Sequence, residues 1–297
     1  GTESTAIYLN ETNSSSLLMT GDISISNADS IGIYLKSDQV YYQDPPSSSS
    51  ASNNNITVNG DISLIDLNAD NNIYRTVREN ILLLGTNTSN NTITVNGDLI
   101  RSRSGTNVSI ENGSNNTINI NGNVIQDLGG ARVSIGGNEN YGTPQNNTIN
   151  MNGNVQGSIG LSGNNNTINV TGNASNYSVG GGSNFLNVDG DVETSGTGMV
   201  ISGDNNTIDF NGSISSTGGG GGNKGILISY SDDSTITIAD DITSKGTASR
   251  RPTYSAILLE NSDNNTIILS GKVQATEYID YYYFAIDTDK NSSGNTF

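Results

Sequence analysis

The chain has 297 residues, of which 32% are hydrophobic and 6% aromatic. It contains no Cys and no His, which excludes disulfides, Cys- or His-liganded zinc and a Ser-His-Asp triad. Its 29 acidic residues against 12 basic ones give a net charge of −17, which argues against a nucleic-acid partner and against docking to anionic lipid.

Apolar strand patterns open the chain at 6–9 and 32–35, and a Pro- and Ser-rich insertion follows at 41–53. From residue 54 onward, one phrase recurs and organises the rest. At 90–99 it reads NNTITVNGDL, and its alternation predicts a strand with Ile93 and Val95 facing inward. Copies of this phrase, some of them weaker, begin at positions 54, 90, 115, 146, 165, 184, 205, 234 and 264.

Two further features frame each phrase. A Gly after the strand, such as Gly97, predicts a corner that needs either φ > 0 or a close approach of two backbones. A short aliphatic strand follows that Gly, and another apolar pair, such as Val108 and Ile110, comes before the next phrase. One repeat therefore predicts three short strands joined by three corners. Insertions interrupt the corners at 66–80, 136–145, 218–222, 245–253 and 276–283.

The spacing of the corner glycines indicates the fold. It falls to 19 residues from Gly153 to Gly172 and to 18 from Gly172 to Gly190, which is too short for a helical hairpin but matches one turn of a parallel β-helix. We predict an all-β fold, a right-handed parallel β-helix (solenoid) of roughly ten coils with loop insertions at the corners. We expect one such domain over 1–297, with no membrane-spanning run, continuing beyond both ends of the sequence.

Polar residues repeat with the same period. An Asn just before each Thr-Ile pair predicts a ladder of stacked side-chain amides, although Asn is also a common turn residue. A Thr at the start of each strand predicts an outward ladder beside it. Such a Thr array can suit ice binding, but the second column is broken by Asn119, Asn150, Asp209 and Ile268, which favours simple solubility.

The phrase N-N-T-I-x-V-x-G-[DN]-[IVL], preceded by G-I-x-[IL], resembles the passenger domains of bacterial autotransporters (type V secretion). The resemblance covers nearly the whole chain through repeat style. It implies a β-helix exported through the outer membrane and displayed on the bacterial cell surface. Many such passengers are adhesins or promote aggregation, and others carry a protease or esterase domain. Because the chain has no His and no G-x-S-x-G elbow, we predict no catalytic residues.

The arginines are one candidate ligand-binding set. All seven lie between a Gly-corner strand and the next apolar pair, and stacking predicts that the first five share one edge. Such an edge suits a carboxylate or sulfate of a host glycan or protein, although local neutralisation of acidic neighbours is the simpler interpretation. The five candidates are Arg75, Arg78, Arg101, Arg103 and Arg132.

Aromatic residues form a second candidate set near the end of the chain. Tyrosine presents a rigid apolar face with a polar tip, which suits contact with a sugar or a protein, and the alternative is a loop that covers the edge of the coil. The predicted contacts are Tyr278, Tyr281, Tyr282 and Tyr283.

Acidic clusters raise two further possibilities. Asp66-x-Asn68-x-Asp70 and Asp287-x-Asp289-x-Asn291 place oxygen ligands at alternate positions, as Ca²⁺ sites do, but both lack the Gly of an EF-hand loop. We therefore expect no cofactor, with Ca²⁺ as the alternative.

The pairs Asp232/Asp233 and Asp240/Asp241 are similar to the paired carboxylates of β-helical glycoside hydrolases, yet the repeat itself accounts for the second pair.

The leading prediction is a non-enzymatic surface adhesin or self-association module that binds through a lateral face and its inserted loops. Its partner would be a host-cell or matrix glycan or protein, or another copy of itself on a neighbouring cell. Two alternatives stay open. One is a polysaccharide-degrading β-helix enzyme, and the other is a passive stalk for an activity outside this fragment.

Overall fold

The computed structural model describes residues 4–26, 30–37, 50–65, 79–102, 105–127, 130–136, 143–218, 224–246, 254–276 and 283–297. Among these residues there is no helix, so none that could cross a membrane. The chain divides into two compact units. Unit 1 comprises Gly1–Gly157 and Ser162–Ile168, and unit 2 comprises Ser158–Leu161 and Asn169–Phe297.

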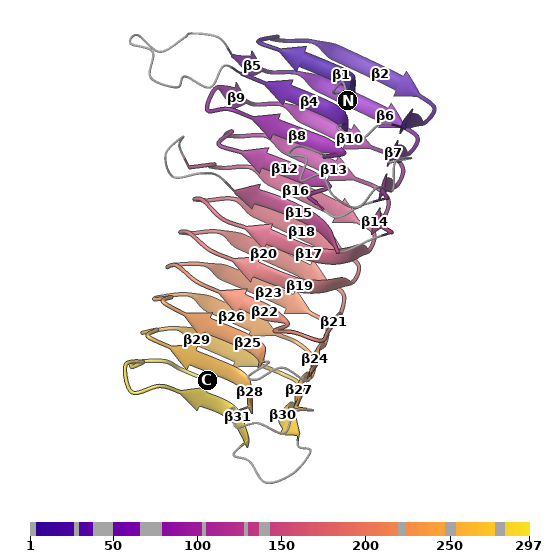
Figure 1. Ribbon diagram of the computed structural model, residues 1–297. Coiled ribbons are helices and arrows are strands. Elements are labelled where there is room, and N and C mark those ends of the chain that lie inside the picture. The colour runs from indigo at the N-terminus through magenta and orange to yellow at the C-terminus, as the bar shows by residue number, and fades with distance from the viewer. Residues whose placement is uncertain are drawn as a thin grey trace, which may run out of the picture. The chain divides into compact units, whose positions relative to one another are not determined.

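The strands fall into three sets, as the repeat predicted, and they pair in parallel with their equivalents in neighbouring coils (Figure 1). The phrase strands, one per coil, are β2 (Ser16–Thr20), β6 (Asn55–Asn59), β10 (Thr92–Val95), β13 (Thr117–Ile120), β16 (Thr148–Asn152), β18 (Thr167–Thr171), β20 (Phe185–Asp189), β23 (Thr207–Asn211), β26 (Thr235–Ile238) and β29 (Thr266–Leu269). These ten strands confirm the parallel β-helix of roughly ten coils.

The second set follows the Gly corners. It consists of β3 (Ile23–Ile25), β7 (Ile62–Leu64), β11 (Leu99–Arg101), β14 (Val124–Gln126), β17 (Val155–Leu161), β19 (Ala174–Val179), β21 (Val192–Thr194), β24 (Ile214–Gly218), β27 (Ile242–Gly246) and β30 (Val273–Thr276). β19 continues into the third position without a break, because it pairs with both β21 and β22.

The third set precedes the phrases. It consists of β1 (Ser4–Asn10), β4 (Ser30–Lys36), β8 (Ile81–Leu84), β12 (Val108–Glu111), β15 (Ala131–Gly136), β22 (Met199–Ile201), β25 (Lys224–Ser229), β28 (Tyr254–Glu260) and β31 (Tyr283–Thr288). The short strands β5 (Ala51–Ser52) and β9 (Thr88–Ser89) pair at a corner of unit 1.

The core consists of aliphatic columns that run from coil to coil. Ile93 stacks on Ile118, and Val95 stacks on Ile120, with all four side chains fully buried. Each fully buried aliphatic side chain stabilises the fold by about 1.5–3 kcal/mol relative to exposure. Because a coil's aliphatic residues pack on their equivalents in the next coil, a chain with little hydrophobic content still builds a continuous core.

The predicted Asn ladder is present at the corner before the phrase strands. In unit 1, Asn91 is buried, and its backbone N–H and its Nδ2 both donate to Oδ1 of Asn116, each at 3.0 Å. Asn116 donates in the same way to Asn147, at 2.9 and 3.1 Å. In unit 2, Asn206 and Asn265 continue the pattern, with Ser234 replacing Asn between them.

The corners at Gly97 and Gly122 are explained by the close approach of two backbones and not by a positive φ. Gly97 and Gly122 do not have positive φ, but a Cβ on Gly122 would lie within 3.0 Å of the Gly97 carbonyl. A Cβ on Gly97 would meet the Gly60 carbonyl equally closely. Two other corner glycines, Gly21 and Gly172, do have positive φ, of 115° and 144°. Positive φ also occurs at the Asn that opens most phrases, for example Asn90 with φ of 56°.

Candidate interaction face

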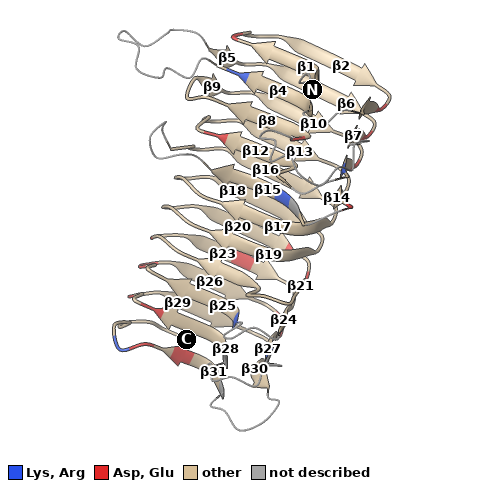
Figure 2. Ribbon diagram, viewed as in Figure 1, with Lys and Arg blue, Asp and Glu red and all other residues tan. Residues whose placement is uncertain are grey.

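The outer side of the phrase strands in unit 1 is the most regular surface among the described residues. We call it the phrase face and define it by the outward side chains of β6, β10, β13 and β16, together with Asn96 and Asn121, which directly follow β10 and β13. None of them is charged, and in Figure 2 these strands carry neither acidic nor basic colour. The phrase face consists of Asn55, Thr57, Asn59, Thr92, Thr94, Asn96, Thr117, Asn119, Asn121, Thr148, Asn150 and Asn152.

Hydrogen bonds along the coil axis order these side chains. Nδ2 of Asn96 donates to Oδ1 of Asn59, and Nδ2 of Asn121 donates to Oδ1 of Asn96, both at 2.7 Å. In the neighbouring column, Nδ2 of Asn119 donates to Oγ1 of Thr94 at 3.2 Å, and Nδ2 of Asn150 donates to Oδ1 of Asn119 at 2.8 Å. Side chains that are already ordered lose little conformational entropy when they bind a partner.

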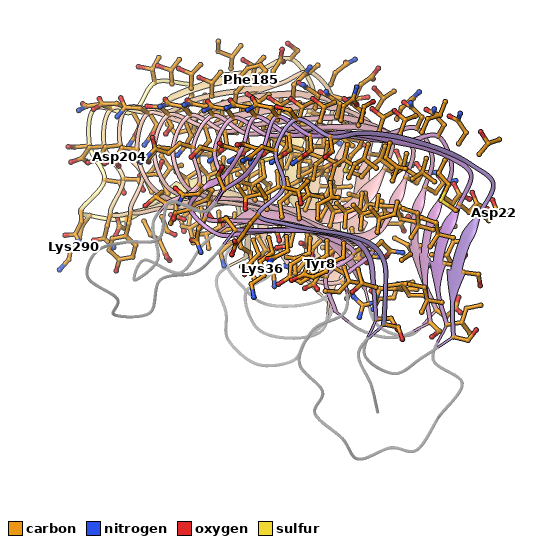
Figure 3. All side chains as sticks on the ribbon, turned by 90° about the horizontal axis from the view of Figure 1, so that it is seen from above. Tyr8, Asp22, Lys36, Phe185, Asp204 and Lys290 are labelled. Atoms are coloured by element: carbon orange, nitrogen blue, oxygen red, sulfur yellow. The ribbon has the colours of Figure 1, made fainter. Side chains whose placement is uncertain are left out.

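The phrase strands of unit 2 present different chemistry. Phe185 stands on the outer side of its coil (Figure 3), and Asp189 lies on the same strand, where it accepts a hydrogen bond from Nδ2 of Asn211 at 3.1 Å. Asp209 adds a second carboxylate, and Ile268 an exposed apolar side chain. Carboxylates therefore interrupt the phrase strands of unit 2 at β20 and β23, whereas β6, β10, β13 and β16 of unit 1 carry none.

A ladder of carboxylates runs along the Gly corner of unit 1. Asp22, labelled in Figure 3, accepts the backbone N–H of Asp61 at 2.9 Å, and Asp61 accepts that of Asp98 at 2.8 Å. Asp98 in turn accepts the N–H of Asn123 at 2.7 Å. Each carboxylate therefore has a structural role in satisfying the backbone of the next coil.

The described members of the predicted Arg edge do not form one patch. Arg101 is only 2% exposed, and its Nη1 donates to the Thr106 carbonyl oxygen at 2.6 Å, so its guanidinium is not available to an external carboxylate. Arg132 is exposed, but it lies on β15 rather than on the strand set of Arg101. The remaining predicted members, Arg75, Arg78 and Arg103, lie outside the described residues.

The predicted Tyr set is mostly outside the described residues, which exclude Tyr278, Tyr281 and Tyr282. Tyr283 begins β31, and its backbone is in register with Tyr254 of β28. The contacts of these tyrosines with a ligand stay a prediction.

Carboxylates of the predicted acidic clusters accept hydrogen bonds from other residues of the chain. Asp289 accepts the Ser292 hydroxyl at 2.6 Å, which is the main cause of the lowered pKa of its carboxyl group. Asp241 accepts the backbone N–H of Lys272, and Asp232 accepts that of Asp263, both at 2.7 Å. Within the described ranges no group of three or more such side chains is placed to hold a metal ion, and 66–70 lies outside them.

A second, shorter Asn ladder in unit 1 lies just before the third-set strands and was not predicted from the sequence. Asn80 and Asn107 are fully buried before the third-set strands, and Nδ2 of Asn107 donates to Oδ1 of Asn80 at 3.1 Å. Nδ2 of Asn80 also donates to the Ile62 carbonyl oxygen at 2.7 Å. The signal that could have found it is an Asn immediately before the apolar pairs at 81–83 and 108–110.

Comparisons with protein-family models, with curated protein sequences and with solved structures found no match to this chain.

Proposed function

We propose that this chain is a non-enzymatic surface module that binds another copy of itself through the phrase face of unit 1. The observation that carries this proposal is the absence of charge from that face in a chain of net charge −17. Two copies of an acidic chain repel each other wherever their charged surfaces meet. An uncharged face is where two copies can approach at the lowest electrostatic cost.

The chemistry of the phrase face also favours a like partner. Amide and hydroxyl groups both donate and accept hydrogen bonds, so a face of Asn and Thr is complementary to itself. A face of carboxylates offers only acceptors and lacks this property. The ladder bonds between Asn59, Asn96 and Asn121 use only part of the hydrogen-bonding capacity of these exposed amides, so further lone pairs and N–H groups are left for a partner.

The location that we propose is the surface of a bacterial cell. Its support is the resemblance of the repeat to autotransporter passengers, together with the parallel β-helix fold. In that setting the phrase faces of passengers on neighbouring cells meet and cause aggregation. A host glycan is the alternative partner, since its hydroxyl groups match the same amides.

Introducing a charge tests the proposal. We expect Thr117→Glu to weaken self-association about tenfold or more, equivalent to about 1.4 kcal/mol, because two added carboxylates meet in the interface. Sedimentation velocity over a concentration series measures this change, and an aggregation assay of cells displaying the chain measures its consequence.

Two matched variants serve as controls. Thr117→Gln changes the size of the same side chain without charge, and Ser24→Glu adds the charge at an exposed position of β3, on another side of the coil. Both should associate as the original chain does. Equal association of Thr117→Glu and Ser24→Glu would rule out the phrase face as the contact.

A further inference from the structure

An asparagine precedes the corner glycine in four consecutive coils of unit 1. These residues are Asn59, Asn96, Asn121 and Asn152, and all four side chains are exposed on the phrase face. Asparagine is a chemically labile residue, and a following Gly makes it more so, because no Cβ shields the backbone nitrogen that can attack the side-chain amide. The phrase face therefore contains amides that each have a reactive neighbour.

The coil requires the glycine of these pairs but not the asparagine. A Cβ on Gly153 would collide with the carbonyl of Gly122, so the corner excludes a side chain there. The residue before the corner is more variable, since Thr20 precedes Gly21 and Asp189 precedes Gly190. The Asn-Gly pairs of unit 1 are thus not imposed by the architecture.

Hydrogen bonds restrain three of the four amides. Asn96 donates to Oδ1 of Asn59 and accepts from Nδ2 of Asn121, both at 2.7 Å, so Asn59 and Asn121 each take part in one ladder bond. The side chain of Asn152 makes no hydrogen bond within the described part of the chain. A bonded amide cannot turn toward the next backbone nitrogen until its bond breaks, so the four sites should differ in reactivity.

We propose that Asn152 is a site of spontaneous deamidation, which adds a carboxylate to the phrase face. Asn121 is the comparison within the same chain, because both residues are exposed and both begin the sequence Asn-Gly-Asn-Val. The backbone N–H groups of Gly122 and Gly153 donate no hydrogen bond to other described residues, so the attacking nitrogen is available at both sites. The ladder bond of Asn121 is what distinguishes the two.

The reaction needs only water. The backbone nitrogen of Gly153 loses its proton and attacks Cγ of Asn152, and the new C–N bond closes a succinimide ring. The bond from Cγ to Nδ2 breaks, and the nitrogen leaves with the electron pair and takes up the proton as ammonia. Water then opens the ring at Cγ to give aspartate, or at the backbone carbonyl to give isoaspartate. Either product has a carboxylate in place of a neutral amide.

The consequence for binding rests on the proposed function, whereas the reaction itself does not. A carboxylate at position 152 places like charges in the contact between two copies of the chain. Isoaspartate also adds a backbone carbon beside Gly153 and so disturbs its close approach to the Gly122 carbonyl. Self-association should therefore weaken as the chain ages.

Peptide mapping by mass spectrometry tests the reaction. The folded chain is incubated in water enriched in the heavy oxygen isotope, which labels each deamidated residue, and samples are digested at intervals. We expect Asn152 to deamidate about fivefold faster than Asn121, because one net hydrogen bond protects Asn121. Asn59 should react faster than Asn96, which begins the same Asn-Gly-Asp sequence but takes part in two ladder bonds.

The same chain unfolded in urea is the control for local sequence. There, Asn121 and Asn152 should deamidate at equal rates. An intact Asn152 in the folded chain, equal rates at Asn121 and Asn152 in the folded chain, or a difference that persists in urea would each overturn the proposal.

A variant pair tests whether the ladder bond is the cause. Asn96→Ala removes the acceptor of Asn121, so the deamidation rate at Asn121 should rise about fivefold, to that of Asn152. Thr94→Val is the matched control, because it removes a hydroxyl that accepts from Asn119 and leaves the bond between Asn96 and Asn121 in place. An unchanged rate at Asn121 in Asn96→Ala contradicts the proposal.

The effect on self-association is measured separately, by sedimentation velocity of Asn152→Asp. This variant should associate more weakly than the original chain. If Asn152 deamidates as expected and Asn152→Asp still associates normally, the modification stands and the phrase face is not the contact between copies.

Discussion

At the scale of single residues, the Asn ladder is where the fold is most sensitive. Asn116 satisfies four buried groups, because it donates to the Thr88 carbonyl and Asn147 and accepts both the backbone N–H and Nδ2 of Asn91. We expect Asn116→Ala to lower the free energy of unfolding by about 3 kcal/mol or more, since several of these groups would lose their partner. Urea denaturation measures this loss.

The control for that variant is Asn96→Ala on the phrase face. Asn96 also belongs to a ladder, but it is exposed, so water replaces its hydrogen bonds. Its loss should cost less than about 1 kcal/mol. A similar loss of stability at the two positions would show that burial is not what makes the ladder of Asn91, Asn116 and Asn147 important.

Tyr177 is a residue whose replacement should stabilise the chain. It is 1% exposed and packs edge-on against Phe210, with ring centroids 5.7 Å apart, but its hydroxyl has no hydrogen-bond partner among the described residues. We expect Tyr177→Phe to raise the free energy of unfolding by about 1 kcal/mol, because it removes an unsatisfied buried polar group. A lower stability of this variant would show that the hydroxyl has a partner in solution.

The same residue predicts how stability depends on alkaline pH. Burial raises the pKa of the Tyr177 hydroxyl well above its ordinary value of 10.0. The unfolded chain therefore loses this proton before the folded chain does, and stability falls as the pH rises above about 10. Tyr177→Phe should reduce this fall, which denaturation curves at several alkaline pH values measure.

At the scale of elements, the strands were predictable and one corner residue was not. The period-two alternation places Ile93 and Val95 inward, and the structure agrees. The same reasoning treated Arg101 as an edge residue, whereas the structure places it in the buried column of Leu64 and Gln126. The buried guanidinium is tolerated there because it donates a hydrogen bond to the Thr106 carbonyl oxygen. The alternation of apolar and polar residues does not predict the backbone path that places this carbonyl beside it.

The candidate face was predictable only in part. The outward Thr ladder follows from the alternation. Its uncharged side chains in unit 1 form a continuous surface only because the strand register places Thr94 beside Asn119, and the alternation alone does not give that register. The Gly corners show a similar limit, since either positive φ or a close backbone approach was possible, and at Gly122 only its stacking on Gly97 decides between the two.

Those corners give a prediction at this scale. Gly122→Ala places a Cβ against the carbonyl of Gly97, which cannot move without displacing its own coil. We expect a loss of about 2 kcal/mol or more in the free energy of unfolding. Gly196→Ala is the matched control, because its Cβ would meet only the Thr194 hydroxyl at 3.7 Å, and thermal denaturation should show little change.

At the scale of the whole molecule, charge and architecture act together. Three acidic side chains of unit 1 occupy the Gly corner, where Asp22, Asp61 and Asp98 each accept a backbone N–H from the next coil. The phrase strands of unit 1 are left free of charge, although the chain has a net charge of −17. Because like charges oppose unspecific association, we propose that copies of the chain meet through this uncharged surface.

The most direct test places a single reporter on the phrase face. The chain has no Cys, so Thr117→Cys provides one thiol for a nitroxide label, and Ser24→Cys provides the matched control. We predict that, as protein concentration rises, the label at position 117 becomes inaccessible to a water-soluble relaxation agent while the label at position 24 stays accessible. Unchanged accessibility at position 117 under conditions where the chain associates would contradict the account.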